Sequence, residues 1–505
     1  MNSVQLLLIV GVGIAVTAVA RRHRIEPGWV IVVLAAGASF IPGVPRLELE
    51  SEFILAVVVP PLLYSATRGA SLASFGANLR AIIYLGVVTV VLTAGVLGWL
   101  SSLLLPSIGL AAAFVLGTVL APPDTITTVS HGDEIGLPQR TTSILTGESL
   151  VNDATALTLF TIAIAAVNGE HATWGGGFLA FLRNASIGLG IGAAFAIVAM
   201  IIRKRLGNPT LETVLVLLLP FTAFLVAEEA HASGILAVVA AAFWMSVNLT
   251  LDPKHQYPGG YRTRLQEEQV WKTLDFLLET FVFAYIGLQL KWVLDAPGLA
   301  RTLTAAGVLL VAAIVFRMVA VFVLFGRWSL RHRRRERRAA RDVYYRQMRE
   351  ARNARRGGEP LPPPTLKENV LVGWTGMRGI LTLAAAAGIP EHTASGAPFP
   401  GRDAIQAIAL IVTLGTLLIQ GTTIGWLARR LRFDLTAERA AADRMRERGH
   451  RIVAEAAAEP APDVDASFEA QRLALGLAVR NHEVTEEVAR ELIEDLDLRQ
   501  AARHT

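Results

Sequence analysis

The chain has 505 residues, of which 53% are hydrophobic and only 18% are charged. Because the apolar residues form a dozen separate runs, this composition excludes a set of soluble domains and indicates a polytopic α-helical membrane protein. The chain has no cysteine, which excludes a disulfide framework and thiolate metal sites.

Thirteen apolar runs are each about long enough to cross a bilayer. They lie near residues 3–20, 27–43, 52–66, 80–102, 108–130, 143–166, 184–202, 211–227, 232–249, 273–290, 303–326, 369–389 and 404–428. The first run lacks a basic leader and a small-residue cleavage site, so we expect it to be a retained span. After Arg432 the chain becomes hydrophilic. We therefore predict an all-α polytopic membrane protein with a transmembrane domain over residues 1–428 and a cytoplasmic helical tail over residues 429–505.

The basic residues are divided unequally between the two sides of the predicted membrane. One set of loops contains 27 Lys and Arg, of which 14 lie in residues 327–367, and the opposite set contains 5. The positive-inside rule makes the first set cytoplasmic, which predicts a plasma-membrane protein with its N-terminus outside and its C-terminus inside. The basic run Arg331–Arg356 suits nucleic-acid phosphates. However, it lies between two spans and its aromatic residues are only the adjacent Tyr344 and Tyr345, so we expect anionic membrane lipid and no nucleic acid as its partner.

The fifth predicted span is interrupted by the segment from Ala121 to Thr128. Pro122 and Pro123 remove backbone donors and disfavour helix before them, so the helix should unwind within the membrane. Freed backbone groups at that depth are tolerated only where they line a cavity or are buried in protein. Carbonyl oxygens at Pro123, together with Asp124 and three threonines, would then supply ligands for an ion. The threonines are Thr125, Thr127 and Thr128. The alternative is a simple proline kink whose threonines cap the freed carbonyls.

The sixth predicted span contains the polar sequence from Gly147 to Asp153. Ser149 and Asp153 are one helical turn apart, and so are Glu148 and Asn152. Carboxylates at membrane depth are costly and persist where they are paired or functional. This cluster therefore predicts a site for a hard cation or a proton.

A second interruption is predicted in the twelfth span, from Gly373 to Gly379. Arg378 within it is not expected to stand unpaired in lipid, and charge balance makes Glu148 its candidate partner. Glu148 and Arg378 would then form a structural ion pair and leave Asp153 as the free carboxylate. Breaks in the fifth and twelfth spans also suggest an inverted repeat in which the two discontinuous helices cross.

Several motifs resemble those of one transporter family in chain order. Residues 147–153, Gly-Glu-Ser-Leu-Val-Asn-Asp, resemble the GES-x-x-ND signature of the monovalent cation:proton antiporter-1 family, the sodium/proton exchangers. Further similar segments are Pro122-Pro123-Asp124, residues 231–239, residues 283–290 and Gly376-Met377-Arg378-Gly379. The resemblance implies a thirteen-helix fold, a homodimer and an ion site formed by Asp153, Asn152, Ser149 and Asp124.

One position departs from the family pattern, and one is a weaker candidate. Many members of that family have an acidic residue where this chain has Ser65, so the resemblance leaves ion preference open. Ser65 would still provide a neutral oxygen. Glu279 enters the tenth span from the cytoplasmic side. Its side chain would either line a water-filled entrance on that side or form a structural pair with another residue. We regard both residues as accessory candidates.

The predicted function is antiport of a monovalent alkali cation for H+, with no cofactor. Asp153 can be neutralised by a proton or by Na+, K+ or Li+, but not by both at once, and this competition predicts electroneutral one-for-one exchange. One alternative is an intramembrane aspartyl protease that uses Asp124 and Asp153 as a dyad, but the chain lacks a G-x-G-D loop. Another is a passive cation channel, but no repeated filter or charged ring is evident.

Overall fold

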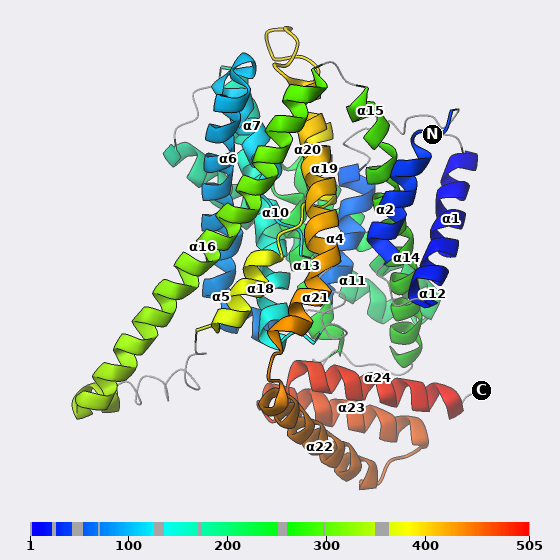
Figure 1. Ribbon diagram of the computed structural model, residues 1–505. Helices are drawn as coiled ribbons and strands as arrows, with labels where there is room; N and C mark the ends of the chain where they lie inside the picture. Colours follow the sequence, from blue (N-terminus) through cyan, green and yellow to red (C-terminus); the bar gives the residue numbers. More distant parts are fainter. Residues whose placement is uncertain are drawn as a thin grey trace. The chain divides into compact units, whose positions relative to one another are not determined.

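The computed structural model describes residues 3–22, 27–42, 54–68, 71–125, 136–169, 174–250, 260–295, 298–348 and 363–503. In these ranges the chain is helical almost throughout (Figure 1). Extended pairing among the described residues is confined to two isolated bridges, one between Asp124 and Met377 and one between His392 and Pro398. The all-α fold predicted from the sequence is confirmed.

Long apolar helices account for most of the predicted spans. Among the described residues, seven are long and apolar enough to cross a membrane: Ser74–Leu104, Gln139–Val167, Leu182–Leu206, Pro209–Glu229, Gly260–Leu294, Leu299–Arg341 and Arg402–Leu431. Shorter apolar helices occupy Gly11–Ala20, Pro27–Ala38, Pro106–Leu120 and Gly234–Ser246. The count of thirteen spans stays a prediction.

The chain divides into two compact units that alternate along the sequence. The first unit comprises Met1–Ala73, Ala172–Trp292 and Asp434–Thr505, and the second comprises Ser74–His171 and Val293–Phe433. The predicted boundary between residues 428 and 429 stays a prediction.

The first unit contains two groups of apolar helices and the C-terminal tail. Its helices are α1 (Ser3–Arg22), α2 (Pro27–Ala38), the π-helical η1 (Ile54–Val58), α4 (Val59–Arg68), α11 (Trp174–Leu206), α12 (Pro209–Glu229), α13 (Gly234–Thr250) and α14 (Gly260–Leu288). The start of α12 follows from local sequence, because Asn208 accepts hydrogen bonds from the amides of Thr210 and Leu211 and Pro209 needs no donor at the first position. Helix α14 packs on α2, α4 and α12.

The tail forms three helices that pack on one another: α22 (Thr436–Ala458), α23 (Val464–Arg480) and α24 (Glu486–Arg503). Its core includes the buried side chains of Phe468, Leu475 and Leu492. Asp497 of α24 is buried and accepts hydrogen bonds from Arg264 of α14, at 2.6 and 2.7 Å, and from Arg472 of α23, at 2.8 Å. Burial lowers the pKa of Arg472 from its ordinary value, and the nearby charge of Asp497 opposes that shift. These contacts attach the tail to α14 within the first unit.

The second unit is built around two interrupted helices. Its elements are α5 (Leu72–Ile83, which begins at the boundary), the π-helical η2 (Tyr84–Thr89), α6 (Val90–Leu104), the 3₁₀ turn η3 (Pro106–Ile108), α7 (Gly109–Leu120), α10 (Gln139–Val167), α15 (Leu290–Leu294, at the boundary), α16 (Leu299–Arg341), α18 (Leu366–Trp374), α19 (Ile380–Ala387), α20 (Arg402–Thr416), the π-helical η5 (Leu417–Gly421) and α21 (Thr422–Leu431).

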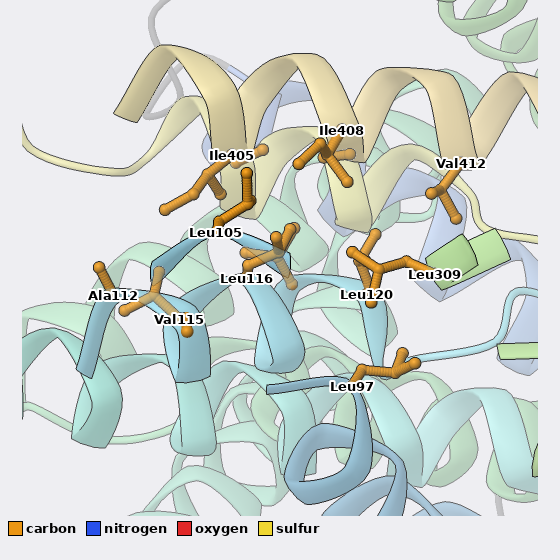
Figure 2. Close-up of a cluster of buried hydrophobic side chains, with 14 of the residues drawn as sticks. Leu97, Leu105, Ala112, Val115, Leu116, Leu120, Leu309, Ile405, Ile408 and Val412 are labelled. Atoms are coloured by element: carbon orange, nitrogen blue, oxygen red, sulfur yellow. The ribbon is translucent and has the colours of Figure 1, made fainter. Parts of the chain in front are cut away.

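Helix α7 lies in the hydrophobic core of the second unit. Figure 2 shows Val115, Leu116 and Leu120 of α7 beneath Ile405 and Ile408 of α20. Leu97 of α6 and Leu309 of α16 belong to the same buried cluster. Because α7 is held on several sides, the chain that leaves its end at Leu120 has a defined starting point.

Candidate functional site

Two interrupted helices of the second unit meet where their chains are extended. Helix α7 ends at Leu120, and Ala121 separates it from Pro122 and Pro123, which disfavour helix in the residue before them. Helix α18 ends at Trp374 and α19 begins at Ile380. The amide of Asp124 donates to the carbonyl of Met377 at 2.6 Å and joins the two interruptions in an antiparallel bridge. The predicted end of helix before Pro122 and the predicted break in the twelfth span are confirmed by this geometry; residues 126–135 lie outside the described chain, so the crossing of the two spans stays a prediction.

The carboxylate of Asp124 lies against the start of α19. A Cβ atom at Gly379 would be 1.7 Å from Oδ2 of Asp124, so only glycine permits this approach. Gly379 is the residue before the first turn of α19. The N-terminus of a helix carries partial positive charge, which favours an ionised carboxylate beside it.

Helix α10 fixes the extended segment from Pro123 to Thr125. The hydroxyl of Thr125 donates to the carbonyl of Leu145 at 2.9 Å and lies 2.6 Å from the Ser149 hydroxyl. The Ser149 hydroxyl also accepts from the amide of Thr125 at 3.2 Å. Thr125 and Ser149 are both buried. The structure thus brings Ser149 and Thr125 together, and their role as ion ligands stays a prediction.

Asn152 anchors the same segment with one half of its amide. Its Nδ2 atom donates to the carbonyl of Pro123 at 2.6 Å. Its Oδ1 atom is buried and has no hydrogen-bond partner among the described residues. A buried acceptor without a partner is costly, so this oxygen is a candidate ligand for a cation.

Asp153 is half-buried on α10, one residue after Asn152 and one turn after Ser149. In the part of the chain that the structure describes, its carboxylate has neither a hydrogen-bond nor an ion-pair partner. Asp124 is the charged group that acts on it electrostatically. Asp153 is therefore the carboxylate of this cluster that is available to a proton or a metal cation.

Glu148 is paired with an arginine that was not among the predicted site residues. Arg317 of α16 donates from both terminal nitrogens to both Glu148 oxygens, at 2.6 and 3.0 Å. The side chains of Glu148 and Arg317 are 0% and 3% exposed. A Cβ atom at Gly376 would be 2.3 Å from Cδ of Arg317, so glycine at 376 leaves room for this arginine.

The predicted pair of Glu148 with Arg378 is therefore wrong. Arg378 instead binds backbone oxygens freed by the two interruptions. Its Nε donates to the carbonyl of Leu120 at 2.7 Å, and its NH1 donates to the carbonyl of Gly376. The end of α7 carries unpaired carbonyls and partial negative charge, which an arginine stabilises. One signal for Arg317 was present in the sequence, since it is the one charged residue between Thr302 and Gly326.

The accessory candidates Ser65 and Glu279 belong to the first unit. The Ser65 hydroxyl donates to Oδ2 of Asp275 on α14, and Oδ1 of Asp275 is buried with no hydrogen-bond partner in the described chain. The accessory role of Ser65 and Glu279 stays a prediction. Thr127 and Thr128, also named as candidate ligands, lie outside the described residues.

Comparisons with known proteins identify the family and the fold of the chain. A family model described as "Sodium/hydrogen exchanger, transmembrane" matches residues 6–430. An uncharacterized Na+/H+ exchanger of Mycobacterium tuberculosis is 28% identical over 441 residues, which cover 84% of this chain and 74% of that protein. A sodium, potassium, lithium and rubidium/H+ antiporter of Bacillus subtilis is 28% identical over 395 residues, covering 76% of this chain and 54% of that protein. The fold resembles the sodium proton antiporter MjNhaP1 of Methanocaldococcus jannaschii, with a TM-score of 0.59, 14% identity and coverage of 85% of this chain and 97% of that one.

Proposed function

Because this chain belongs to the sodium/hydrogen exchanger family, we propose that it exchanges a monovalent alkali cation for H+ across the plasma membrane, with Na+ as the expected cation and K+ or Li+ as alternatives. It is a secondary transporter and not an enzyme, which removes the intramembrane protease alternative. The passive-channel alternative is excluded for the same reason.

The observation that carries the proposal is the pair of unsatisfied oxygen groups at Asn152 and Asp153. The Asn152 amide is held by the Pro123 carbonyl, so its buried Oδ1 cannot turn away from the site. The neighbouring Asp153 carboxylate has no partner in the described chain. An alkali cation prefers oxygen ligands of this kind, and a proton on Asp153 would neutralise the same charge. Asp124, Thr125 and Ser149 complete the proposed ligand set.

The charges of the cluster support one-for-one exchange. Three carboxylates, those of Asp124, Glu148 and Asp153, accompany two arginines, Arg317 and Arg378. The empty site therefore carries one net negative charge, which one proton or one alkali cation cancels. Asp124 lies at the start of α19, where an ionised carboxylate is favoured, and Glu148 is held in its pair with Arg317. Asp153 is left as the group whose charge changes during transport.

Exchange follows from competition at Asp153. A proton and a cation cannot occupy the carboxylate together, so each crossing carries one or the other. If the unoccupied site cannot complete the crossing because of its unbalanced charge, downhill movement of one ion must drive the other uphill. No second titrating group is needed for this scheme.

The test uses purified protein in proteoliposomes that contain a pH-sensitive dye. Imposing Na+, K+, Li+ or choline gradients in turn should move protons for one or more alkali cations and not for choline. Asp153→Asn should abolish exchange in folded protein. Asp403→Asn, at an exposed carboxylate at the start of α20, is the matched control and should exchange like wild type. Proton movement that persists in Asp153→Asn would exclude this carboxylate as the exchanging group.

Stoichiometry is tested in the same vesicles. Electroneutral exchange should proceed at the same rate when a K+ diffusion potential of either sign is imposed with valinomycin, using Na+ as the transported ion. A strong dependence of the rate on that potential would mean that a second carboxylate also exchanges a proton. We further propose a homodimer, with the N-terminus outside and the C-terminus inside, that serves pH and cation homeostasis. The charge bias of the loops supports this orientation.

A further inference from the structure

The interruption between α18 and α19 leaves backbone groups that a helix would have satisfied. The carbonyl of Trp374 accepts from Nε2 of Gln420 at 2.8 Å. The amide of Arg378 donates to the hydroxyl of Thr416 at 2.9 Å, and that hydroxyl donates onward to the carbonyl of Thr413 at 3.1 Å. Both ends of the interruption are therefore held by side chains from one neighbouring segment.

That segment is itself irregular. Thr416 is the last residue of α20, and Gln420 lies in the π-helical η5. Gly421, at the end of η5, lies against the sulfur of Met377, which would be 3.2 Å from a Cβ atom at that position. π-helical turns are rare and are found frequently at functional sites. Thr416, at the end of α20, and Gln420 and Gly421, in the π-helical turn, contact three residues of the interruption.

The held residues are also the ones that contact the ion site. The Met377 carbonyl accepts the amide of Asp124, and Arg378 binds the carbonyl of Leu120 at the end of α7. A shift of residues 374–378 would therefore move the backbone of Asp124. Pro123, which precedes Asp124, accepts the hydrogen bond that orients Asn152. The contacts form a continuous path from η5 to the proposed ligands.

Burial makes the two side chains sensitive to substitution. Thr416 and Gln420 are both almost fully buried, and Oε1 of Gln420 has no partner among the described residues. A buried glutamine with one unsatisfied oxygen is costly. Its amide donor contact with Trp374 is the described interaction that offsets this cost.

We propose that Thr416 and Gln420 are positioning residues that hold the α18–α19 interruption in register and thereby set the cation affinity of the site. They act through Met377, Arg378 and Asp124 and do not touch the ion. The inference rests on the proposed exchange function, because it assigns these residues an effect on cation affinity. Thr416→Val keeps the shape of the side chain and leaves the Arg378 amide without an acceptor. Gln420→Met keeps the length of the side chain and removes the donor to Trp374.

The experiment compares KM for Na+ and the maximal exchange rate in proteoliposomes. We expect Thr416→Val and Gln420→Met to raise KM about tenfold, in line with the loss of one buried hydrogen bond, while the maximal rate per folded protein changes less than about twofold. Thr416→Ser restores the hydroxyl and should return KM to near the wild-type value. Thr422→Val is the matched control, since the Thr422 hydroxyl is exposed and donates to the Leu418 carbonyl of its own helix. It should behave like wild type.

The outcomes distinguish failure of the proposed exchange function from failure of the proposed positioning role. Wild-type protein that exchanges no alkali cation for H+ refutes the proposed function itself. Wild-type exchange with an unchanged KM in folded Thr416→Val and Gln420→Met refutes the positioning role alone. If Thr416→Val does not fold, Gln420→Met decides the question by the same KM measurement. Failure of both variants to fold, or an equal KM shift in Thr422→Val, would also overturn the positioning role in favour of general helix packing.

Discussion

Neutralising Glu148 should destabilise the protein strongly, because Glu148 is the acceptor for both terminal nitrogens of Arg317 within the described chain. Both terminal nitrogens of Arg317 bind Glu148, and its Nε has no partner among the described residues. The pair is almost fully shielded, with side-chain exposures of 0% and 3%. Removing one partner of such a pair costs roughly 3–5 kcal/mol, since the surviving charge stays buried and uncompensated. We expect Glu148→Gln to lower the melting temperature by on the order of 10 °C.

The assay is thermal unfolding of purified protein in detergent, followed by tryptophan fluorescence. Arg317→Met should destabilise to a similar degree as Glu148→Gln. The double variant Glu148→Gln/Arg317→Met removes both charges and should recover at least half of the loss, because replacing a buried pair by neutral groups of similar size is often well tolerated. The difference between the double variant and the sum of the single variants measures the interaction of the pair.

An exposed ion pair provides the matched control. Arg446 and Glu491 of the tail interact at 2.9 Å with both side chains about half exposed. Pairs of this kind contribute about 0–1 kcal/mol, so Glu491→Gln should melt close to wild type. The reasoning is refuted if Glu148→Gln melts like Glu491→Gln, or if the double variant is as unstable as the two single variants combined.

Three further predictions concern the approach of Asp124, the tail and the topology. Gly379→Ala places a methyl group where Oδ2 of Asp124 lies and should reduce Na+/H+ exchange in vesicles at least about tenfold. Gly307→Ala is the control, because the space around Gly307 is open, and it should exchange at the wild-type rate. Equal exchange rates in the two variants would refute the close approach of Asp124 to Gly379. Asp497→Asn removes the acceptor shared by Arg264 and Arg472, so limited trypsin digestion should release the tail faster than in the wild-type protein. The control is Asp495→Asn, because the Asp495 carboxylate pairs with Arg499 within α24. Identical digestion rates in the two variants would show that Asp497 does not attach the tail. A reporter fused after Thr505 should be cytoplasmic, and residues 331–348 should resist labelling from outside in intact cells; external labelling would reverse the proposed orientation.

The two helix interruptions could be predicted because their causes are local. Pro122 and Pro123 remove donors wherever they stand, and the glycines on either side of Arg378 permit extended backbone. The polar sequence from Glu148 to Asp153 could likewise be predicted as a site, since carboxylates in an apolar run need an explanation. That the two interruptions come together was predicted from their matching positions in the two halves of the chain, and the bridge between Asp124 and Met377 is the contact that joins them.

The partners of the charged residues could not be predicted, because pairing depends on which helix faces lie together. Charge balance requires that Glu148 have a cation nearby, but it applies equally to Arg317 and Arg378. Helix packing decides between them: Arg317 passes over Gly376 to reach Glu148, while Arg378 is drawn to the carbonyls at the end of α7. Thr416 and Gln420 gave no signal, since hydroxyl and amide side chains within apolar helices usually bond to their own backbone.

The presence of Arg317 beside Glu148 changes the net charge of the site and with it the argument for stoichiometry. With Arg378 as the sole arginine, three carboxylates would leave two net negative charges, and a single cation could not cancel them. Arg317 adds the missing positive charge inside the membrane, so the empty cluster carries one net negative charge however the two arginines are assigned. A charge left unbalanced in a low-dielectric interior is costly, and one proton or one alkali cation removes it. In the proposed mechanism, the arginine that pairs with Glu148 would thereby leave Asp153 as the one carboxylate needed for one-for-one exchange.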